Sequence, residues 1–192
     1  MLIELIENRR SVREYKQTEV PKELVEEVVD AARLAPSGCN AQPIIYYIVD
    51  GGKTREMRKR EVFYQDFVYA APTLIVCCGN PKAYKIPEGY ARQRREGSVP
   101  EDVEERMGEF FSGEQKVRER VIRDVSIAST YLVLRATELG LGTCYVGWFE
   151  EHSLKDILKL PRDYVIPFVI TVGYPKKIPE QTPRKRLDEI II

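Results

Sequence analysis

The chain has 192 residues, of which 43% are hydrophobic and 31% are charged, and this length and composition fit a single domain, residues 1–192, with a substantial core. Its 30 basic and 30 acidic side chains cancel, which argues against a nucleic-acid partner. Because no apolar run approaches the roughly 18 residues that a membrane span requires, we expect a cytoplasmic protein without a membrane partner.

The first predicted element is a short helix that leads into a basic turn. Leu2, Leu5 and Ile6 recur at helical spacing. The turn over Arg9–Arg13 then places three arginines around Ser11, and guanidinium groups donate to phosphate oxygens in forked pairs. The turn is therefore a candidate phosphate site, although a solvated basic turn also explains the same residues.

A second helix and a polar loop are predicted next. Pro21 suits the first turn of a helix. An apolar stripe follows and stops before Pro36: Leu24, Val25, Val28, Val29 and Ala32. The loop over Ser37–Pro43 offers a hydroxyl, two carboxamides and exposed backbone amides to a ligand, while Ser, Gly and Asn also form ordinary turns.

Two buried strands are predicted over residues 44–49 and 73–78. Both runs are rich in β-branched or aromatic residues, and they are closed by Gly51-Gly52 and by Gly79-Asn80-Pro81. The segment over residues 81–116 is rich in Arg, Glu, Gly and Pro and has only a weak apolar stripe. We expect it to form a lid or a mobile insertion.

The longest predicted helix carries one apolar face over Val121–Leu139, and Gly140 is placed to end it. Strands are predicted over residues 142–149 and 166–173, with a helix over residues 153–160 between them. Together the elements predict an α+β fold, in which a central, mostly antiparallel sheet of about four strands is flanked by helices.

The C-terminal extension over residues 175–192 joins a basic cluster, Arg184–Arg186, to an apolar end with three isoleucines. Such an end has high β-propensity and needs a partner surface. It could add an edge strand to the sheet of its own subunit or of a second one. We favour the second, which predicts a homodimer with exchanged C-terminal strands.

The cysteines and the single histidine form no recognisable catalytic or metal site. Cys77 and Cys78 lie inside a predicted strand and are interpreted as core residues. No CxxC pair is present, and His152 stands alone at the expected start of a helix. These patterns argue against structural zinc and against a hydrolytic triad.

The order of these segments resembles the nitroreductase family of FMN enzymes along nearly the whole chain. The matching segments are, in order, Arg9–Arg13, Ala35–Pro43, Ala71-Pro72, Gly140–Cys144 with Gly147, and the tail over Arg184–Ile190. The resemblance implies bound FMN and a homodimer with the flavin at the subunit interface.

The resemblance also implies which residues bind FMN. The phosphate, the ribityl chain and the pyrimidine edge would be held by Arg9, Arg10, Ser11 and Arg13. Arg184 would complete the phosphate site, with Arg186 as the alternative. The second subunit would contribute Pro36, Ser37, Gly38 and Asn40, and the isoalloxazine ring would lie close to Val146 and Gly147.

The implied activity is the reduction of a small acceptor, such as a nitroaromatic or a quinone, by NADH or NADPH through FMN in a ping-pong order. The flavin transfers the electrons in that chemistry, so no catalytic side chain is expected. Ile44, where many relatives carry tryptophan, and the insertion over residues 81–116 leave the acceptor open. The alternatives are a deiodinase-like enzyme, a flavin-fragmenting enzyme and a non-catalytic FMN-binding or sensing protein.

Overall fold

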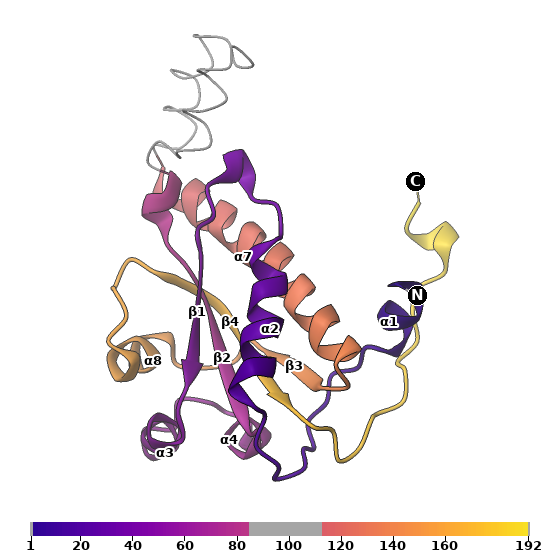
Figure 1. Cartoon of the computed structure of the whole chain (residues 1–192). Coiled ribbons are helices and arrows are strands. Elements are labelled where there is room, and N and C mark those ends of the chain that lie inside the picture. Colours follow the sequence, from indigo (N-terminus) through magenta and orange to yellow (C-terminus); the bar gives the residue numbers. More distant parts are fainter. Residues whose placement is uncertain (1, 85–112, 192) are drawn as a thin grey trace.

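A four-stranded sheet forms the centre of the computed structural model, which describes residues 2–84 and 113–191 (Figure 1). The strands are β1 (Ile44–Val49), β2 (Thr73–Gly79), β3 (Gly142–Val146) and β4 (Val165–Gly173). Their order is β1-β2-β4-β3, and every neighbouring pair is antiparallel. The predicted α+β fold with a four-stranded antiparallel sheet is therefore confirmed.

The central strand β2 divides the core into two clusters. Side chains alternate between the two faces of a strand, so Ile75 and Cys77 pack on one face while Leu74, Val76 and Cys78 pack on the other. Every residue of β2 is buried, because both of its faces are covered. The interpretation of the two cysteines as core residues is confirmed.

Helices α2 (Lys22–Arg33) and α7 (Glu114–Glu138) cover the first face of the sheet (Figure 1). They bury the apolar stripes expected from the sequence: Val25, Val28 and Ala32 of α2, and Val121, Val125, Ala128, Leu132 and Ala136 of α7. Gly140 follows α7 with a φ of 74°, a conformation that glycine adopts without strain and that ends a helix. Both predicted helices are confirmed.

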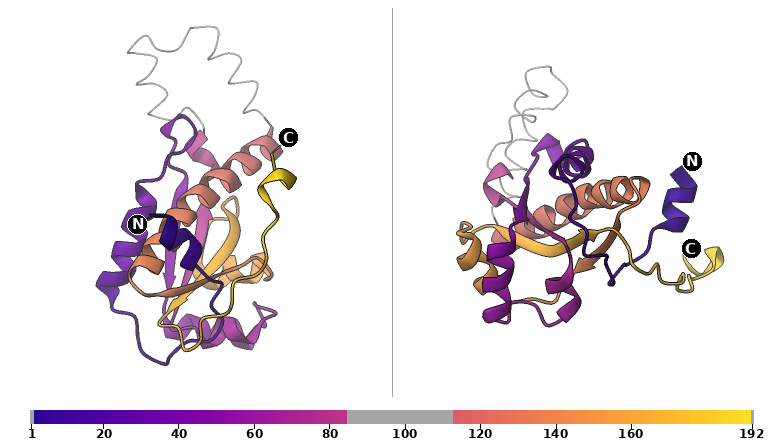
Figure 2. Two further views of the ribbon diagram at one scale, coloured as in Figure 1. Left: turned by 90° about the vertical axis from the view of Figure 1, so that its right-hand side faces the viewer. Right: turned by 60° about the horizontal axis from the view of Figure 1, so that its bottom comes forward.

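Three shorter helices cover the second face, as the right-hand view of Figure 2 shows. They are α3 (Gly51–Lys59), α4 (Asp66–Ala70) and α8 (Glu151–Leu158). Their contributions to the second cluster include Met57, Val68 and Leu154, all fully buried. The sheet therefore lies between two layers of helix.

The helices of this second layer depart from the sequence expectations. Neither α3 nor α4 is predicted, and Gly51-Gly52 begins α3 instead of closing β1. Asp50 caps α3, since its carboxylate accepts a hydrogen bond from Lys53 N–H at 2.9 Å. Helix α8 begins two residues earlier than expected, so His152 lies within its first turn, and it ends at Leu158 before a left-handed Lys159.

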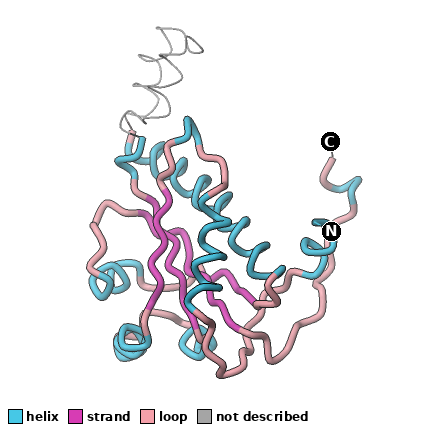
Figure 3. The backbone as a smooth tube through the Cα atoms, viewed as in Figure 1, coloured by secondary structure: helices cyan, strands magenta, loops and turns pink. Residues whose placement is uncertain are grey.

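The two ends of the chain project from the same side of this body (Figures 1 and 2). Helix α1 (Leu2–Asn8) buries none of its residues. A long loop after β4 (Figure 3) leads to the 3-10 turn η3 (Leu187–Glu189). Within the described chain this segment turns at η3 and adds no strand to its own sheet. Its exchange between subunits stays a prediction.

The structure also shortens β3 and bounds the predicted insertion. Strand β3 ends at Val146 and not at residue 149. The insertion over residues 81–116 begins with the 3-10 turn η2 (Pro81–Tyr84) and ends in the first turn of α7. Residues 85–112 lie outside the described part of the chain, so the lid stays a prediction. Within the described part, no helix is long and apolar enough to cross a bilayer.

Candidate functional site

The basic turn of the sequence lies against the beginning of β3. Ser11 forms an isolated parallel bridge with Thr143, and Val12 N–H donates to the Thr143 carbonyl oxygen at 2.8 Å. Val12 is buried, and a Cβ added to Gly142 would come within 2.8 Å of its side chain. Glycine at this position therefore permits the close approach of the two segments. Side chains alternate along extended backbone, so Ser11 faces away from Val12.

Arg9 and Arg13 place two positive charges near Cys144 of β3. Burial raises the pKa of the Cys144 thiol, and the charges of Arg13 and Arg9 oppose that shift. The Arg13 guanidinium donates to the Ser11 carbonyl oxygen at 3.4 Å and lies 5.8 Å from the centroid of the Phe67 ring. Neither arginine forms an ion pair with a carboxylate of residues 2–84 or 113–191. Both charges are thus available to an anion.

Arg10 differs from its neighbours, because its side chain turns back to the end of α1. Its Nη1 donates to the carbonyl oxygens of Glu7 and Arg9, the second at 2.9 Å. The carbonyl groups at the C-terminal end of a helix stabilise a cation placed there. A contact between Arg10 and FMN would compete with these hydrogen bonds and stays a prediction.

The chain after β4 returns beside the basic turn. Lys176 N–H donates to the Glu14 carbonyl oxygen at 2.9 Å. A hollow of about 200 Å³ lies between the two segments and is lined by Ser11, Arg13, Glu14, Lys177 and Pro179. The sequence patterns do not single out Lys177, which adds a cation to this hollow. Its only sequence signal is its place just after a predicted strand.

The two candidate arginines of the tail differ in their partners. Arg186 forms an ion pair with Asp188 at 2.5 Å. Arg184 donates to the hydroxyl and carbonyl oxygens of Thr182 and to the carbonyl oxygen of Pro183, and pairs with no carboxylate of the described chain. No carboxylate of residues 2–84 or 113–191 neutralises the charge of Arg184, which favours this residue over Arg186 as a phosphate ligand.

The loop over Ser37–Pro43 has an unusual backbone and contains the 3-10 turn η1 (Gly38–Asn40). Three of its residues have positive φ without being glycine: Cys39 at 53°, Asn40 at 51° and Gln42 at 47°. Ser37 Oγ closes the loop by accepting a hydrogen bond from Gln42 N–H at 2.9 Å, and the hydroxyl hydrogen can still donate. Such conformations cost roughly 1–3 kcal/mol each and are concentrated at ligand sites.

The loop and the basic turn lie at opposite ends of α7 (Figure 1). Gly38 N–H donates to Asp124 Oδ2 at 3.0 Å, whereas the basic turn lies beside β3, which follows the other end of the helix. The stretch of α7 from Asp124 to Glu138 spans roughly 20 Å, at about 1.5 Å per residue. Within one chain, the predicted site residues therefore form two separate groups.

The residues expected near the flavin ring lead to an exposed aromatic pair. Val146 is buried, whereas Gly147 is exposed, and no atom lies within 4 Å of the place that its Cβ would take. Trp148 is 64% exposed, and its ring centroid lies 5.0 Å from that of Tyr64, which is 50% exposed. The sequence patterns miss this pair because its members are far apart in the chain. The available signal is that Trp148 is the only tryptophan.

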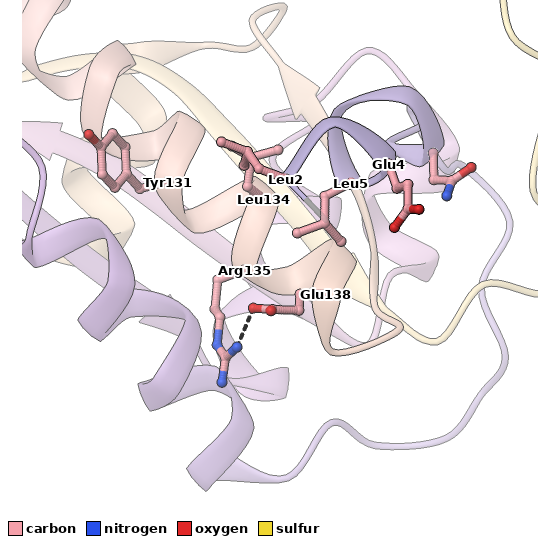
Figure 4. A pocket seen from close by; sticks show the side chains of 8 residues that line it. Leu2, Glu4, Leu5, Tyr131, Leu134, Arg135 and Glu138 are labelled. Carbon is pink, nitrogen blue, oxygen red and sulfur yellow. Dashed lines mark hydrogen bonds and ion pairs between the residues drawn. The ribbon is translucent and has the colours of Figure 1, made fainter.

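A larger hollow of about 830 Å³ lies between α1 and α7 (Figure 4). Its apolar lining comes from Leu2 and Leu5 of α1 and from Tyr131 and Leu134 of α7, and the ion pair of Arg135 and Glu138 borders it. The same two helices carry further exposed apolar side chains: Ile3 and Ile6 of α1 and Ile127 of α7. Exposed apolar side chains gathered on two neighbouring helices are typical of an interface.

Known proteins resemble this chain in both sequence and fold. The sequence profile of the Nitroreductase family matches residues 6–174. A relative from Methanothermobacter thermautotrophicus, provisionally named NADH dehydrogenase/NAD(P)H nitroreductase, is 30% identical over 186 residues, which cover 93% of this chain and 79% of that protein.

Two solved structures share the fold along the whole chain. A nitroreductase family protein from Streptococcus pneumoniae has a TM-score of 0.83 at 24% identity, and the match covers 100% of this chain and 99% of that protein's chain. A structure from Exiguobacterium sibiricum, solved in complex with FMN, has a TM-score of 0.81 at 21% identity, and the match covers 100% of this chain and 96% of the chain in that structure. From the match over residues 6–174, the chain belongs to the nitroreductase family.

Proposed function

We propose that this chain is an FMN-dependent oxidoreductase, which takes electrons from NADH or NADPH and passes them to a small acceptor such as a nitroaromatic or a quinone. The observation that carries the proposal is the pair of arginines, Arg9 and Arg13, which flank Ser11 and have no carboxylate partner in the described chain. Membership of the nitroreductase family supports the proposal. So do the name of the Methanothermobacter relative, which includes NAD(P)H, and the FMN bound in the Exiguobacterium structure.

The residues of the basic turn and of β3 fit FMN. Arg9, Ser11 and Arg13 offer charged and hydroxyl donors of the kind that bind phosphate oxygens, and Arg13 would also stabilise negative charge at the pyrimidine edge. The open backbone at Gly147 leaves room for a flat ring, roughly 13 Å along the strand from Thr143. FMN supplies the electron transfer when it is bound, and the chain binds and orients it.

The same proposal includes a homodimer with a shared site. The loop over residues 36–40 and the basic turn lie at opposite ends of α7, so in this proposal the loop of a second subunit completes the site. The apolar surface of α1 and α7 supports an interface. The tail adds further exposed apolar side chains: Leu187, Ile190 and Ile191. The cytoplasmic location expected from the sequence stays a prediction.

The exposed pair of Tyr64 and Trp148 supports a planar acceptor. Trp148 is the residue directly after Gly147, and its ring packs against that of Tyr64. Aromatic rings bind flat ligands in offset-stacked or edge-to-face arrangements. Nitroaromatics and quinones both present such a flat face.

Anaerobic reduction of the flavin tests the proposed function. The purified protein should bind FMN, NADH or NADPH should bleach the visible absorbance of the flavin, and menadione or a nitroaromatic should restore it. Initial rates at several fixed acceptor concentrations should give parallel double-reciprocal lines. Intersecting lines would refute the ping-pong order. Bound flavin that neither nucleotide bleaches would indicate a non-catalytic FMN-binding protein, and a protein that takes up no FMN from excess would refute the whole proposal.

A further inference from the structure

A buried carboxylate in α7 has no part in the proposed flavin contacts. Asp124 lies among the apolar side chains of the helix and is only 4% exposed. Its Oδ2 accepts a hydrogen bond from Gly38 N–H at 3.0 Å and another from Tyr84 O–H. A buried carboxylate is costly unless it is hydrogen-bonded, so these two donors stabilise it in place.

Gly38 packs tightly into this group. A Cβ added to Gly38 would collide with the guanidinium of Arg120, whose Cζ lies 5.9 Å from the centroid of the Tyr84 ring. Burial, together with the bond to Asp124, raises the pKa of the Tyr84 phenol above its ordinary value. Tyr84 therefore keeps its proton at neutral pH and remains the donor to Asp124.

The hydrogen bond from Gly38 fixes the strained part of the loop from outside. Gly38 directly precedes Cys39 and Asn40, which both have positive φ. Ser37 and Gln42 close the loop internally through the bond to the Ser37 hydroxyl. Because positive φ is unfavourable for these residues, the conformation persists only where the surroundings impose it. The hydrogen bond between Gly38 and Asp124 is one such contact, and Asp124 belongs to a long helix packed on the sheet.

We propose that Asp124 is a positioning residue for the flavin site: by holding Gly38, it determines where the Ser37 hydroxyl and the Asn40 side chain meet the flavin of the second subunit. Tyr84 supports Asp124 through the second hydrogen bond. This inference rests on the proposed function and extends it to a residue that contacts neither flavin nor substrate.

Substitutions of Asp124 test the inference by FMN titration of the FMN-free protein. Asp124→Leu removes the acceptor, whereas Asp124→Asn keeps an oxygen that can accept both hydrogen bonds. We expect Asp124→Leu to weaken FMN binding about tenfold or more and Asp124→Asn to restore most of the affinity. The matched control Asp30→Leu removes an exposed carboxylate of α2, which pairs with Arg33, and should leave the affinity unchanged.

Amide hydrogen exchange measures the loop without any flavin. The Gly38 amide should exchange about tenfold faster in Asp124→Leu than in the wild type, while amides in the buried middle of α7, such as Leu132, keep their protection. Tyr84→Phe removes one donor without touching Gly38 and should change both FMN affinity and Gly38 exchange in the same direction by a smaller factor. This second variant keeps the test valid where Asp124→Leu folds poorly.

The outcomes separate this inference from the proposed function. If wild-type protein binds FMN and both Asp124→Leu and Tyr84→Phe bind it equally well, the inference is overturned. It is also overturned if both Asp124 variants lose FMN affinity to the same extent together with protection throughout α7, since that result shows general destabilisation. If the wild-type protein binds no FMN, the proposed function itself fails.

Discussion

Arg9, Arg10 and Arg13 stand close together in the chain but differ in what they contact. Arg10 caps α1 through carbonyl groups, whereas Arg9 and Arg13 have no carboxylate partner in the described chain and lie near Cys144. The sequence cannot distinguish the three arginines, because it does not show which side chain turns back to the helix. We therefore expect Arg9 and Arg13 to contribute more to phosphate binding than Arg10.

Substitution of Arg9 tests this expectation. Arg9→Ala should raise the dissociation constant of FMN about tenfold to a hundredfold, because one hydrogen bond to a charged group contributes about 1.5–3 kcal/mol. Fluorescence titration of the FMN-free protein measures the change. Arg33→Ala removes an exposed arginine of α2 and is the control, with no change expected. An Arg9→Ala protein with wild-type affinity would show that the phosphate lies elsewhere.

Trp148 offers a second test at the residue scale, because it is the only tryptophan in the chain. A flavin ring at Gly147 would lie next to its indole, so FMN should quench the tryptophan emission as the site fills. Trp148→Phe should abolish this emission while the fluorescence of FMN still reports binding. Tryptophan emission that stays constant while FMN binds would contradict the predicted position of the ring.

At the scale of elements, the strands and the long helices follow from the sequence, whereas the short helices do not. Helices α2 and α7 carry apolar stripes over several turns, which is the signal that periodicity detects. Helix α3 has nine residues with one buried side chain, and α4 has five residues, so neither shows a repeating stripe. Asp50 before α3 was a capping signal, but Gly51-Gly52 has the composition of a turn.

The contact between β2 and α7 gives a prediction for an element. A Cβ added to Gly79 would collide with Val121 and come within 3.0 Å of Val125. Gly79→Ala should therefore lower the free energy of unfolding by about 1–3 kcal/mol, as overpacking of a core does, in urea denaturation of the FMN-free protein. Gly51→Ala, in the exposed first turn of α3, is the matched control and should be neutral or slightly stabilising. Equal stability of the two variants would mean that α7 moves aside freely.

At the scale of the whole molecule, the sequence identifies the two segments of the candidate site but not the distance between them. Their separation depends on α7, which extends from the loop to the start of β3. A local sequence pattern predicts this helix but does not predict how it is oriented on the sheet. Asp124 was detectable as a carboxylate on the apolar stripe between Val121 and Val125, although its partner Gly38 was not. The proposed sharing of the site between two subunits would let both segments contact one flavin.

Mixed dimers test the shared site. Arg9→Ala and Asn40→Ala should each weaken FMN binding and activity when present in both subunits. A heterodimer of the two variants, purified with a different affinity tag on each chain, would carry both changes in one site and neither in the other. It should show about half of the wild-type activity. If each chain instead forms its own complete site, every site in the heterodimer is defective and no activity returns.

The length of α7 has a consequence for how related chains can differ. Each helical residue advances the chain by about 1.5 Å and rotates it by roughly 100°. Loss or gain of a single residue between Asp124 and Glu138 would turn the Asp124 carboxylate away from Gly38 while the end of the helix stays beside β3. Insertions and deletions that evolution has accepted are therefore expected in the connecting loops and the tail, and not in this stretch of the helix.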